Sequence, residues 1–441
     1  MKESTIKKAG SGLLGKLFEK IKERISALFR GGFFHVFTGT FLNKAVTMIS
    51  SIVVARFVDK DQYAYLGYAD TVYGYLALFT GLGMASAMLK VCAGQTSKEN
   101  DRAYLGYAIR WTLAFSLIVT TITVAVMCLI QLPFEGAKHF LIVMALYPAF
   151  YCVYDLLITY VRSKSYVKQY AYLNLLYSIL TCALSILFVL CFDAIGIVFA
   201  RYIVLAVLAL ILFKYVHGIF LGTEKESLHP ELKRNFWKIS LTLVVANAFS
   251  VMMPYNENML ISHIIAETEV LSNYRVANYL PQMILLVSQA VVVYFFPIIA
   301  AMDNEGKSIQ RFVIRVGLLN FGLVVFCAAV GMALTPIVLP LMYGSKYADA
   351  IHISMFLWIM RGLNAGIRIV PMNMLIAVGQ YRFNLCMSVI TSFAQIIVDW
   401  YFISKMGVYG VFAGTVIIYL IIGVVYWARF IRVSAVRGSA E

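Results

Sequence analysis

Charged residues are scarce in this chain. Asp, Glu, Lys and Arg make up 13% of its 441 residues, whereas hydrophobic residues make up 61% and the mean hydropathy is +0.81. This balance excludes a soluble enzyme, a disordered chain and a nucleic-acid-binding protein. The net charge of +15 does not indicate a nucleic-acid partner. The basic residues stand in short patches between long apolar runs, where they set orientation in a membrane.

Patterns typical of metal, redox or nucleotide chemistry are missing. The seven cysteines form no CxxC pair and the six histidines form no HExxH spacing, so the sequence predicts no disulfide framework and no metal site. The stretch 10–16 reads GxxxxGK, but Leu17 follows where a phosphate-binding loop needs Ser or Thr, and no strand precedes it. We therefore expect no cofactor, no use of ATP and no enzymatic activity.

Long apolar runs dominate instead. A spanning helix needs about 20 apolar residues, and we predict about twelve, giving an all-α polytopic membrane protein. They lie near 32–57, 64–90, 105–130, 139–161, 169–191, 195–218, 238–262, 272–300, 312–341, 350–377, 383–403 and 408–431.

The distribution of positive charge predicts the orientation of these helices. With both termini in the cytoplasm, the cytoplasmic segments hold roughly 27 of the 37 Lys and Arg residues, as the positive-inside rule requires. Residues 1–31 read as a basic amphipathic helix at the cytoplasmic interface. The expected parts are this segment, an N-lobe at 32–221, a cytoplasmic linker at 222–237, a C-lobe at 238–432 and a cytoplasmic tail at 433–441.

Short words recur at corresponding places in the two halves. Residues 136–138 (GAK) match 344–346 (GSK), and 68–70 (YAD) match 276–278 (VAN), both at a separation of 208 residues. Residues 198–200 and 411–413 share VFA at a separation of 213. Because each half holds six predicted helices, the repeats are parallel, with a pseudo-two-fold axis along the membrane normal. Transporters built this way bind substrate between two lobes and alternate the side that is open.

Polar residues form stripes on three predicted spans. Helical spacing places the members of each stripe on one face. The stripes are Thr40, Lys44, Thr47 and Ser51 in 32–57; Asn247, Ser250, Pro254 and Glu257 in 238–262; and Ser354, Arg361, Asn364 and Arg368 in 350–377.

Three cations lie deep in these spans: Lys44, Arg361 and Arg368. Facing lipid, they would together cost roughly 8–10 kcal/mol on insertion scales, so they face protein or water. Two interpretations remain open, a hydrated cationic cavity or ion pairs with Asp70, Asp155 or Asp399. Arg201 and Arg275 stand at the predicted outer ends of their helices, where orientation and headgroup contact compete with a binding role.

Several loose motifs, in order, resemble the polysaccharide (O-antigen type) flippase family of the multidrug/oligosaccharidyl-lipid/polysaccharide exporter superfamily. They span nearly the whole chain after residue 31. They are Ile52–Val58, Tyr65–Tyr68, Gly81–Gly83, Phe296–Pro297, Met342–Tyr347 and Gly407–Gly410. The resemblance implies a V-shaped, MATE-like bundle of two six-helix lobes in the bacterial cytoplasmic (inner) membrane. It implies transport of an undecaprenyl-pyrophosphate-linked oligosaccharide from the cytoplasmic to the outer leaflet, for surface polysaccharide synthesis.

An anionic lipid headgroup needs a cationic cavity. The expected substrate-binding residues are Lys44, Arg361, Arg368, Asn364, Asn247, Arg275 and Arg201, and the candidates for coupling to H⁺ or Na⁺ are Asp70 and Glu257. Membrane lipids and other polysaccharide assembly proteins are further expected partners. Two alternatives remain: a cation-coupled multidrug exporter, which needs deep acids in excess, and a membrane polymerase or ligase, which needs a large outer loop.

Overall fold

The computed structural model describes residues 33–92, 98–164, 166–220, 228–304 and 309–438. The predicted amphipathic segment 1–31 lies outside the described residues. Helices account for the described chain, and no strand occurs within those ranges. The first half contains α2 (Phe33–Phe57), α3 (Lys60–Thr80), α4 (Met84–Cys92), α5 (Lys98–Leu129), α6 (Ala137–Val143), α7 (Tyr147–Ser163) and α8 (Val167–Phe220).

The second half begins with α9 (Pro230–Val251), eight residues before the expected span. It continues with α10 (Met253–Leu260), the π-helix η1 (Ile261–Ile265), α11 (Thr268–Gln282), α12 (Ile284–Asn304), α13 (Gln310–Tyr343), the 3₁₀ turn η2 (Ser345–Tyr347), α14 (Ala350–Leu363), the π-helix η3 (Asn364–Arg368), α15 (Ile369–Ala377), α16 (Tyr381–Met406) and α17 (Val408–Gly438).

The predicted all-α, multi-span fold is confirmed. Among the described residues, seven continuous helical stretches are long and apolar enough to cross a membrane, and two bent pairs, α3–α4 and α6–α7, raise the number to nine. One of the seven, Lys168–Leu212, holds two expected spans, because α8 consists of two helices joined at Asp193. The two other expected spans correspond to α2 and to α9, α10 and η1.

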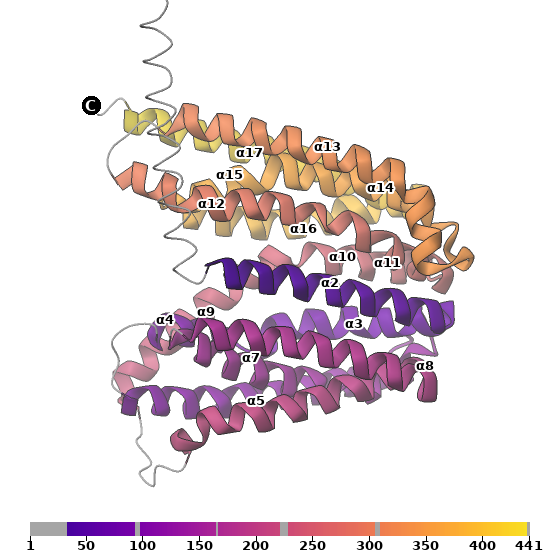
Figure 1. The fold of residues 1–441 in the computed structure, drawn as a ribbon, viewed down its shortest axis with the longest axis horizontal. Coiled ribbons are helices and arrows are strands. Elements are labelled where there is room, and N and C mark those ends of the chain that lie inside the picture. The colour runs from indigo at the N-terminus through magenta and orange to yellow at the C-terminus, as the bar shows by residue number, and fades with distance from the viewer. Residues whose placement is uncertain (1–32, 93–97, 165, 221–227, 305–308, 439–441) are drawn as a thin grey trace, which may run out of the picture.

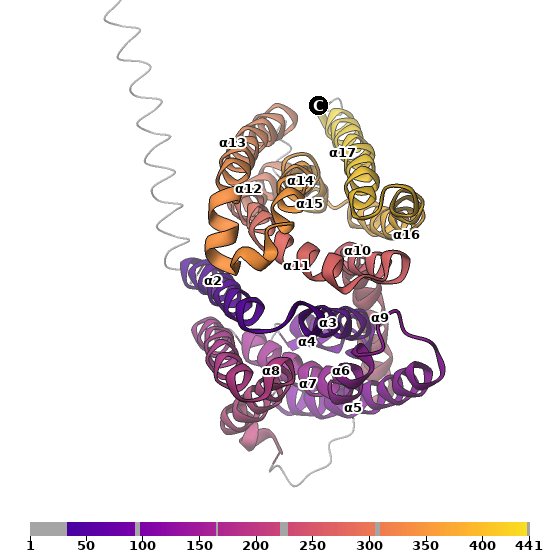
Figure 2. The ribbon, with the colours of Figure 1, turned by 90° about the vertical axis from the view of Figure 1, so that its right-hand side faces the viewer.

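The helices form two groups lying side by side (Figure 1). In the first half, α8 packs against α2 and α7, and α7 also packs against α4 and α5. In the second half, α14 packs against α11 and α13, and α16 against α17. Figure 2, a view along the helices, shows α3, α10 and α11 at the boundary between the groups, where α3 contacts both α10 and α11. We call the groups the N-lobe and the C-lobe.

The two halves repeat one backbone turn. Asp193 has φ 56° and ψ −148°, and Gly407, in the turn between α16 and α17, has φ 60° and ψ −143°. Three residues beyond each turn stands a glycine at which a Cβ atom would lie 2.2 Å from a carbonyl oxygen: Gly196 against Phe188, and Gly410 against Phe402. Such close packing admits only glycine. The same construction at equivalent places supports the internal repeat read from the sequence.

The helices of two spans are interrupted close to their polar residues. The helix of the seventh span is interrupted at Met252, with Pro254 in the first turn of α10, because proline lacks the N–H that would continue the ladder. π-Turns are wider than α-turns and shift the following residues around the axis. One of them, η3, lies between Arg361 and Ile369 in the tenth span.

Candidate functional site

A polar cluster centred on Asp70 of α3 joins the two lobes. Arg201 of α8 binds its carboxylate through both terminal nitrogens, at 2.5 and 3.2 Å. Arg275 of α11 donates to the same carboxylate at 3.1 Å and to the backbone oxygen of Tyr63 at 2.9 Å. We call Asp70, Arg201 and Arg275 the Asp70 clamp. It joins a C-lobe arginine to the N-lobe and carries one net positive charge.

Neighbouring residues are shaped to hold the two arginines. The guanidinium of Arg275 lies over the ring of Tyr63, 4.7 Å from its centroid, and that of Arg201 lies over Tyr147 at 5.7 Å. Such cation–π contacts fix the orientation of a guanidinium that is partly withdrawn from water. Gly67 leaves the space for Arg275, since a Cβ atom there would lie 1.9 Å from Nη1.

Two cavities open on either side of the clamp. One, of about 380 Å³, contains Asp70 and Arg201 in its wall, and the other, also about 380 Å³, contains Asp70 and Arg275. The first, which we call the N-lobe cavity, is lined mainly by N-lobe residues and is rich in tyrosine: Tyr73, Tyr147, Tyr151, Tyr177 and Tyr255. Tyr255 of α10 lines both cavities, as Asp70 does. The clamp therefore forms the partition between an N-lobe cavity and an inter-lobe cavity.

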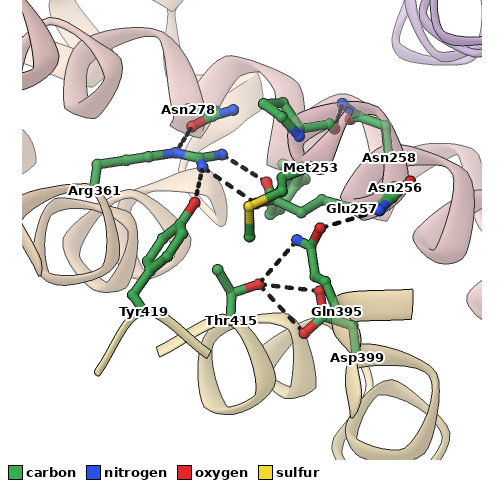
Figure 3. A network of polar contacts seen from close by, with 12 residues as sticks. Met253, Asn256, Glu257, Asn258, Asn278, Arg361, Gln395, Asp399, Thr415 and Tyr419 are labelled. Carbon is green, nitrogen blue, oxygen red and sulfur yellow. Dashed lines mark hydrogen bonds and ion pairs between the residues drawn. The ribbon is translucent and has the colours of Figure 1, made fainter. Parts of the chain in front are cut away.

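A second polar network lies inside the C-lobe (Figure 3). Arg361 of α14 binds the carboxylate of Glu257 through two bonds of 2.6 and 3.2 Å, and both side chains are almost completely buried. Asn278 accepts a hydrogen bond from Nε of Arg361 at 3.1 Å, and the Tyr274 hydroxyl donates to Glu257 at 2.7 Å. Burying two charges is tolerated when their geometry and remaining hydrogen bonds are this complete. Arg361 thus has an acidic partner, although not one of the three acids considered from sequence.

Arg368 is held differently. It is 8% exposed, donates to Asn364 at 3.3 Å and lies over the ring of Tyr419. Within the described part of the chain it has no acidic partner, and its Nε has no hydrogen-bond acceptor. The structure therefore brings Arg368 and Asn364 together, as a buried cation beside the Glu257–Arg361 pair.

The remaining predicted site residues are not part of either network. Lys44 lies on an exposed position of α2, while its neighbours Asn43 and Thr47 line the N-lobe cavity. The side chain of Asn247 lies outside the described residues, as does that of Thr40. Ser178 of α8 donates a hydrogen bond to the Asn43 side chain, which anchors this face of α2 to the N-lobe.

Further contacts close one end of the lobe boundary. Lys60 pairs with Glu269 at 2.5 Å, and Thr268 donates to Asp61 at 2.5 Å, so the start of α3 is joined to the start of α11. Lys346 donates to the backbone oxygens of Val58 and Arg56, at 2.7 and 3.1 Å. Burial beside Lys60 lowers the pKa of Lys346. These residues all belong to segments that the charge distribution places outside the membrane on the non-cytoplasmic side.

Sequence reasoning missed Asn278, Tyr274 and Tyr419 as members of the C-lobe network. A signal for Asn278 was present. It occupies the place in the second repeat that Asp70 occupies in the first, and each accepts hydrogen bonding from an arginine of its own lobe, Arg361 for Asn278 and Arg201 for Asp70. The tyrosines gave no such signal, because the chain contains 28 of them.

Two lobes of spanning helices with buried charges and cavities at their boundary define a multi-pass membrane protein of the transporter type.

The fold agrees with solved MATE structures. The structure titled as the inward-facing conformation of a multidrug resistance MATE family transporter of the MOP superfamily has a TM-score of 0.73 and 16% identity, covering 90% of this chain and 96% of that one. The outward-facing structure of the same title has a TM-score of 0.59 and 15% identity, with 92% and 95% covered. A MATE structure in complex with MaL6 has a TM-score of 0.65 and 15% identity, with 92% and 95% covered.

The family is given by sequence. The model of the family described as "Polysaccharide biosynthesis protein" matches residues 29–303, more than half of the chain, and the chain belongs to this family. No curated protein shows significant similarity to it. The family and fold are those of transporters and flippases, as the sequence predicted.

Proposed function

We propose that the chain is a flippase that moves a polyprenyl-pyrophosphate-linked oligosaccharide from the cytoplasmic to the outer leaflet by alternating access. The Asp70 clamp carries this proposal. Two arginines from different lobes share one carboxylate between two cavities. A pyrophosphate brings more negative charge than the carboxylate and matches the forked donors of arginine. It can therefore compete with Asp70 for both guanidinium groups.

The same competition supplies a route from binding to movement. Asp70 belongs to the N-lobe and Arg275 to the C-lobe, so their ion pair at 3.1 Å holds the lobes together. A phosphate that takes over Arg275 releases this link. The headgroup then binds more tightly to the conformation in which α3 and α11 are separated. This difference in affinity between the closed and separated conformations shifts the equilibrium toward separation.

The walls of the N-lobe cavity suit the sugars. Tyrosines present a flat apolar ring and a polar hydroxyl at its edge. The five tyrosines of this cavity offer both to the apolar faces and hydroxyl groups of an oligosaccharide. The deep cations of the sequence interpretation, Lys44, Arg368 and Arg361, are assigned secondary roles: Lys44 and Arg368 attract the anionic headgroup, and Arg361 binds it only in a conformation that frees it from Glu257.

Family membership and the charge distribution support the cellular setting. We place the protein in the bacterial cytoplasmic membrane with both termini inside. In that orientation the contacts of Lys60, Thr268 and Lys346 close the outer end, and the described conformation receives substrate from the cytoplasm.

A multidrug exporter is the alternative that the fold relatives suggest. A cationic drug needs an acid available where it binds, whereas the acid in the walls of the two clamp cavities, Asp70, is already bound by two arginines. Deletion of the gene separates the two functions. Retention of the lipid-linked oligosaccharide on the cytoplasmic leaflet supports flipping, and gained drug sensitivity with normal oligosaccharide distribution supports export.

The clamp itself is tested in proteoliposomes containing a fluorescent polyprenyl-pyrophosphate oligosaccharide. Arg275→Ala and Arg201→Ala should each lower the flipping rate at least tenfold, and Arg275→Lys should recover it only in part, because lysine lacks the planar fork. Arg429→Ala is the matched control. Like the clamp arginines, Arg429 is partly buried, donates to a side-chain oxygen, here that of Gln380, and lies over a ring, here that of Phe383. It is not in the wall of either clamp cavity. Clamp variants that flip as fast as the control would refute the assigned role.

A further inference from the structure

Asp399 is a buried carboxyl group that the clamp and the Glu257–Arg361 pair leave out. It lies seven residues before the end of α16, is completely buried, and pairs with no Lys, Arg or His within the described part of the chain. Thr415 of α17 donates to it at 3.0 Å, and the Gln395 amide is its other polar neighbour. Gly414 leaves room for the carboxyl, because a Cβ atom there would lie 2.2 Å from Oδ1.

The ionisable groups that face Asp399 do not neutralise it. They are Glu257 of α10, Arg361 of α14, Tyr274 of α11 and Tyr419 of α17. The one cation among them, Arg361, is already bound by Glu257 at 2.6 Å. Of the other elements packed against α16, α15 has no charged residue, and η1 contributes His263, whose ring lies against Tyr68. The helix α9 contacts α16 through Phe249, whereas its charged residues lie between Pro230 and Lys238, near its start. A carboxylate that has a hydroxyl and an amide as neighbours but no free cation is costly to bury, whereas its neutral form is much less so.

A chain of hydrogen bonds leads from Asp399 to the other lobe. Gln395 donates to Thr415 at 3.4 Å, and Asn256 of α10 donates to Gln395 at 3.2 Å. Asn256 in turn accepts a hydrogen bond from Tyr75, which belongs to α3 of the N-lobe. The chain therefore runs from a buried acid through Thr415, Gln395 and Asn256 of the C-lobe (Figure 3). From Asn256 it continues to Tyr75, across the lobe boundary.

We propose that Asp399 is the proton-binding site that couples a proton gradient to the movement of the lobes. With the proton bound, Asp399 stays in its closed pocket, and the chain to Tyr75 holds α10 against α3. Loss of the proton leaves an unpaired buried charge, which is relieved when α16 and α17 move and admit water. The protonated protein therefore favours the described conformation, closed where α3 meets α11, and the deprotonated protein favours the opposite one.

This assignment differs from the acids chosen by sequence. Asp70 and Glu257 each have arginine partners in this conformation, whereas Asp399 has none among the described residues. In the orientation proposed above, a proton entering from outside would return the empty carrier to the state that is open to the cytoplasm. That direction is the one an exporting flippase needs.

The test measures lobe separation without any lipid-linked sugar, so its outcome is independent of the proposed substrate. Spin labels replace Lys138 of α6 and Lys405 of α16, which are exposed on different lobes at the end where α3 meets α11. The full chain, with its seven native cysteines replaced, is placed in nanodiscs and the distance distribution is recorded from acidic to alkaline pH. We expect the separated population to grow with pH, by up to about tenfold per pH unit for one proton. Asp399→Asn should make the distribution independent of pH.

Two further variants keep the test decisive. Asp155→Asn is the matched control, since Asp155 is another acid without an ion pair in the described chain, in the wall of a separate cavity of about 320 Å³; its pH response should remain. Gly414→Ala displaces the carboxyl and should shift the midpoint pH. A pH-independent wild type, an unchanged response in Asp399→Asn, or a response to Na⁺ at constant pH that depends on Asp399 would each overturn the proposal.

Discussion

At the scale of single residues, buried charges are the main feature of this protein. Asp70 binds two arginines and Glu257 binds one, whereas Arg368 contacts an amide, a thioether sulfur and a ring but no acid among the described residues. A charge inside a membrane protein is retained where it is paired or where it serves transport. The pairs differ in consequence. The Asp70 clamp lies between the lobes beside cavities, whereas the Glu257–Arg361 pair lies inside the C-lobe and joins α10 to α14.

The Glu257–Arg361 pair should therefore act first on stability. Arg361→Ala leaves Glu257 buried and unpaired, which costs about 3–5 kcal/mol, and it should lower the melting temperature of the detergent-purified protein. The double variant Arg361→Met, Glu257→Gln removes both charges and should recover most of the loss. Melting curves read by size-exclusion chromatography provide the measurement. An Arg361→Ala protein of normal stability that no longer flips would instead place Arg361 in the substrate path.

At the scale of elements, interrupted helices position the site. α3 and α4 meet at a bend of 43°, where Gly83 has φ +66°. A Cβ atom at Gly83 would lie 2.5 Å from the Ser240 backbone oxygen and 2.9 Å from the Val244 nitrogen, both in α9. The Ser240 hydroxyl also donates to the Leu82 oxygen. The first helix of the second half thus packs its backbone directly against the bend of the N-lobe.

This close approach makes a specific prediction for glycine. Gly83→Ala places a methyl group against backbone atoms and forces a left-handed conformation, which alone costs about 1–2 kcal/mol. We expect less folded protein and a lower melting temperature. Gly106 of α5 is the matched control, since a Cβ atom there meets nothing within 4 Å; Gly106→Ala should be neutral or stabilising by up to about 1 kcal/mol. Equal effects of the two substitutions would show that the α4–α9 contact does not limit stability.

These elements show which features of the fold the sequence predicts and which it does not. The length of the apolar runs is enough to predict each spanning segment. It also predicts a break between residues 191 and 195, and in the structure Asp193 interrupts α8 there. The π-turns η1 and η3 were not foreseen, because their residues, Ile261–Ile265 and Asn364–Arg368, have an ordinary helical composition. The pairing of Arg361 with Glu257 could not be read either, since helical spacing gives the face of each helix and not which faces meet. From the sequence alone, Asp399 is only one of three possible ion-pair partners for the deep cations.

At the scale of the whole molecule, the ion pairs between the lobes lie along one pair of helices. The two inter-lobe ion pairs of the described residues, Lys60–Glu269 and Asp70–Arg275, both join α3 to α11. Between them along α3 lie Asp61, bound by Thr268, and Tyr68, whose hydroxyl is 3.5 Å from the His263 ring nitrogen. We call this contact between α3 and α11 the seam. If the seam opens and closes once per transported lipid, a covalent link across it should stop transport and leave the two lobes folded.

The most direct test of the account fixes this seam during transport. Asp61→Cys and Thr268→Cys, in a background free of native cysteines, are joined by a short reducible crosslinker in proteoliposomes that hold a fluorescent polyprenyl-pyrophosphate oligosaccharide. An impermeant quencher then reports the leaflet of the lipid. The account predicts flipping before crosslinking, none after it, and recovery on reduction, with either single-cysteine variant unaffected. Failure of the uncrosslinked protein to move the lipid, or flipping that continues through the crosslinked state, would contradict it.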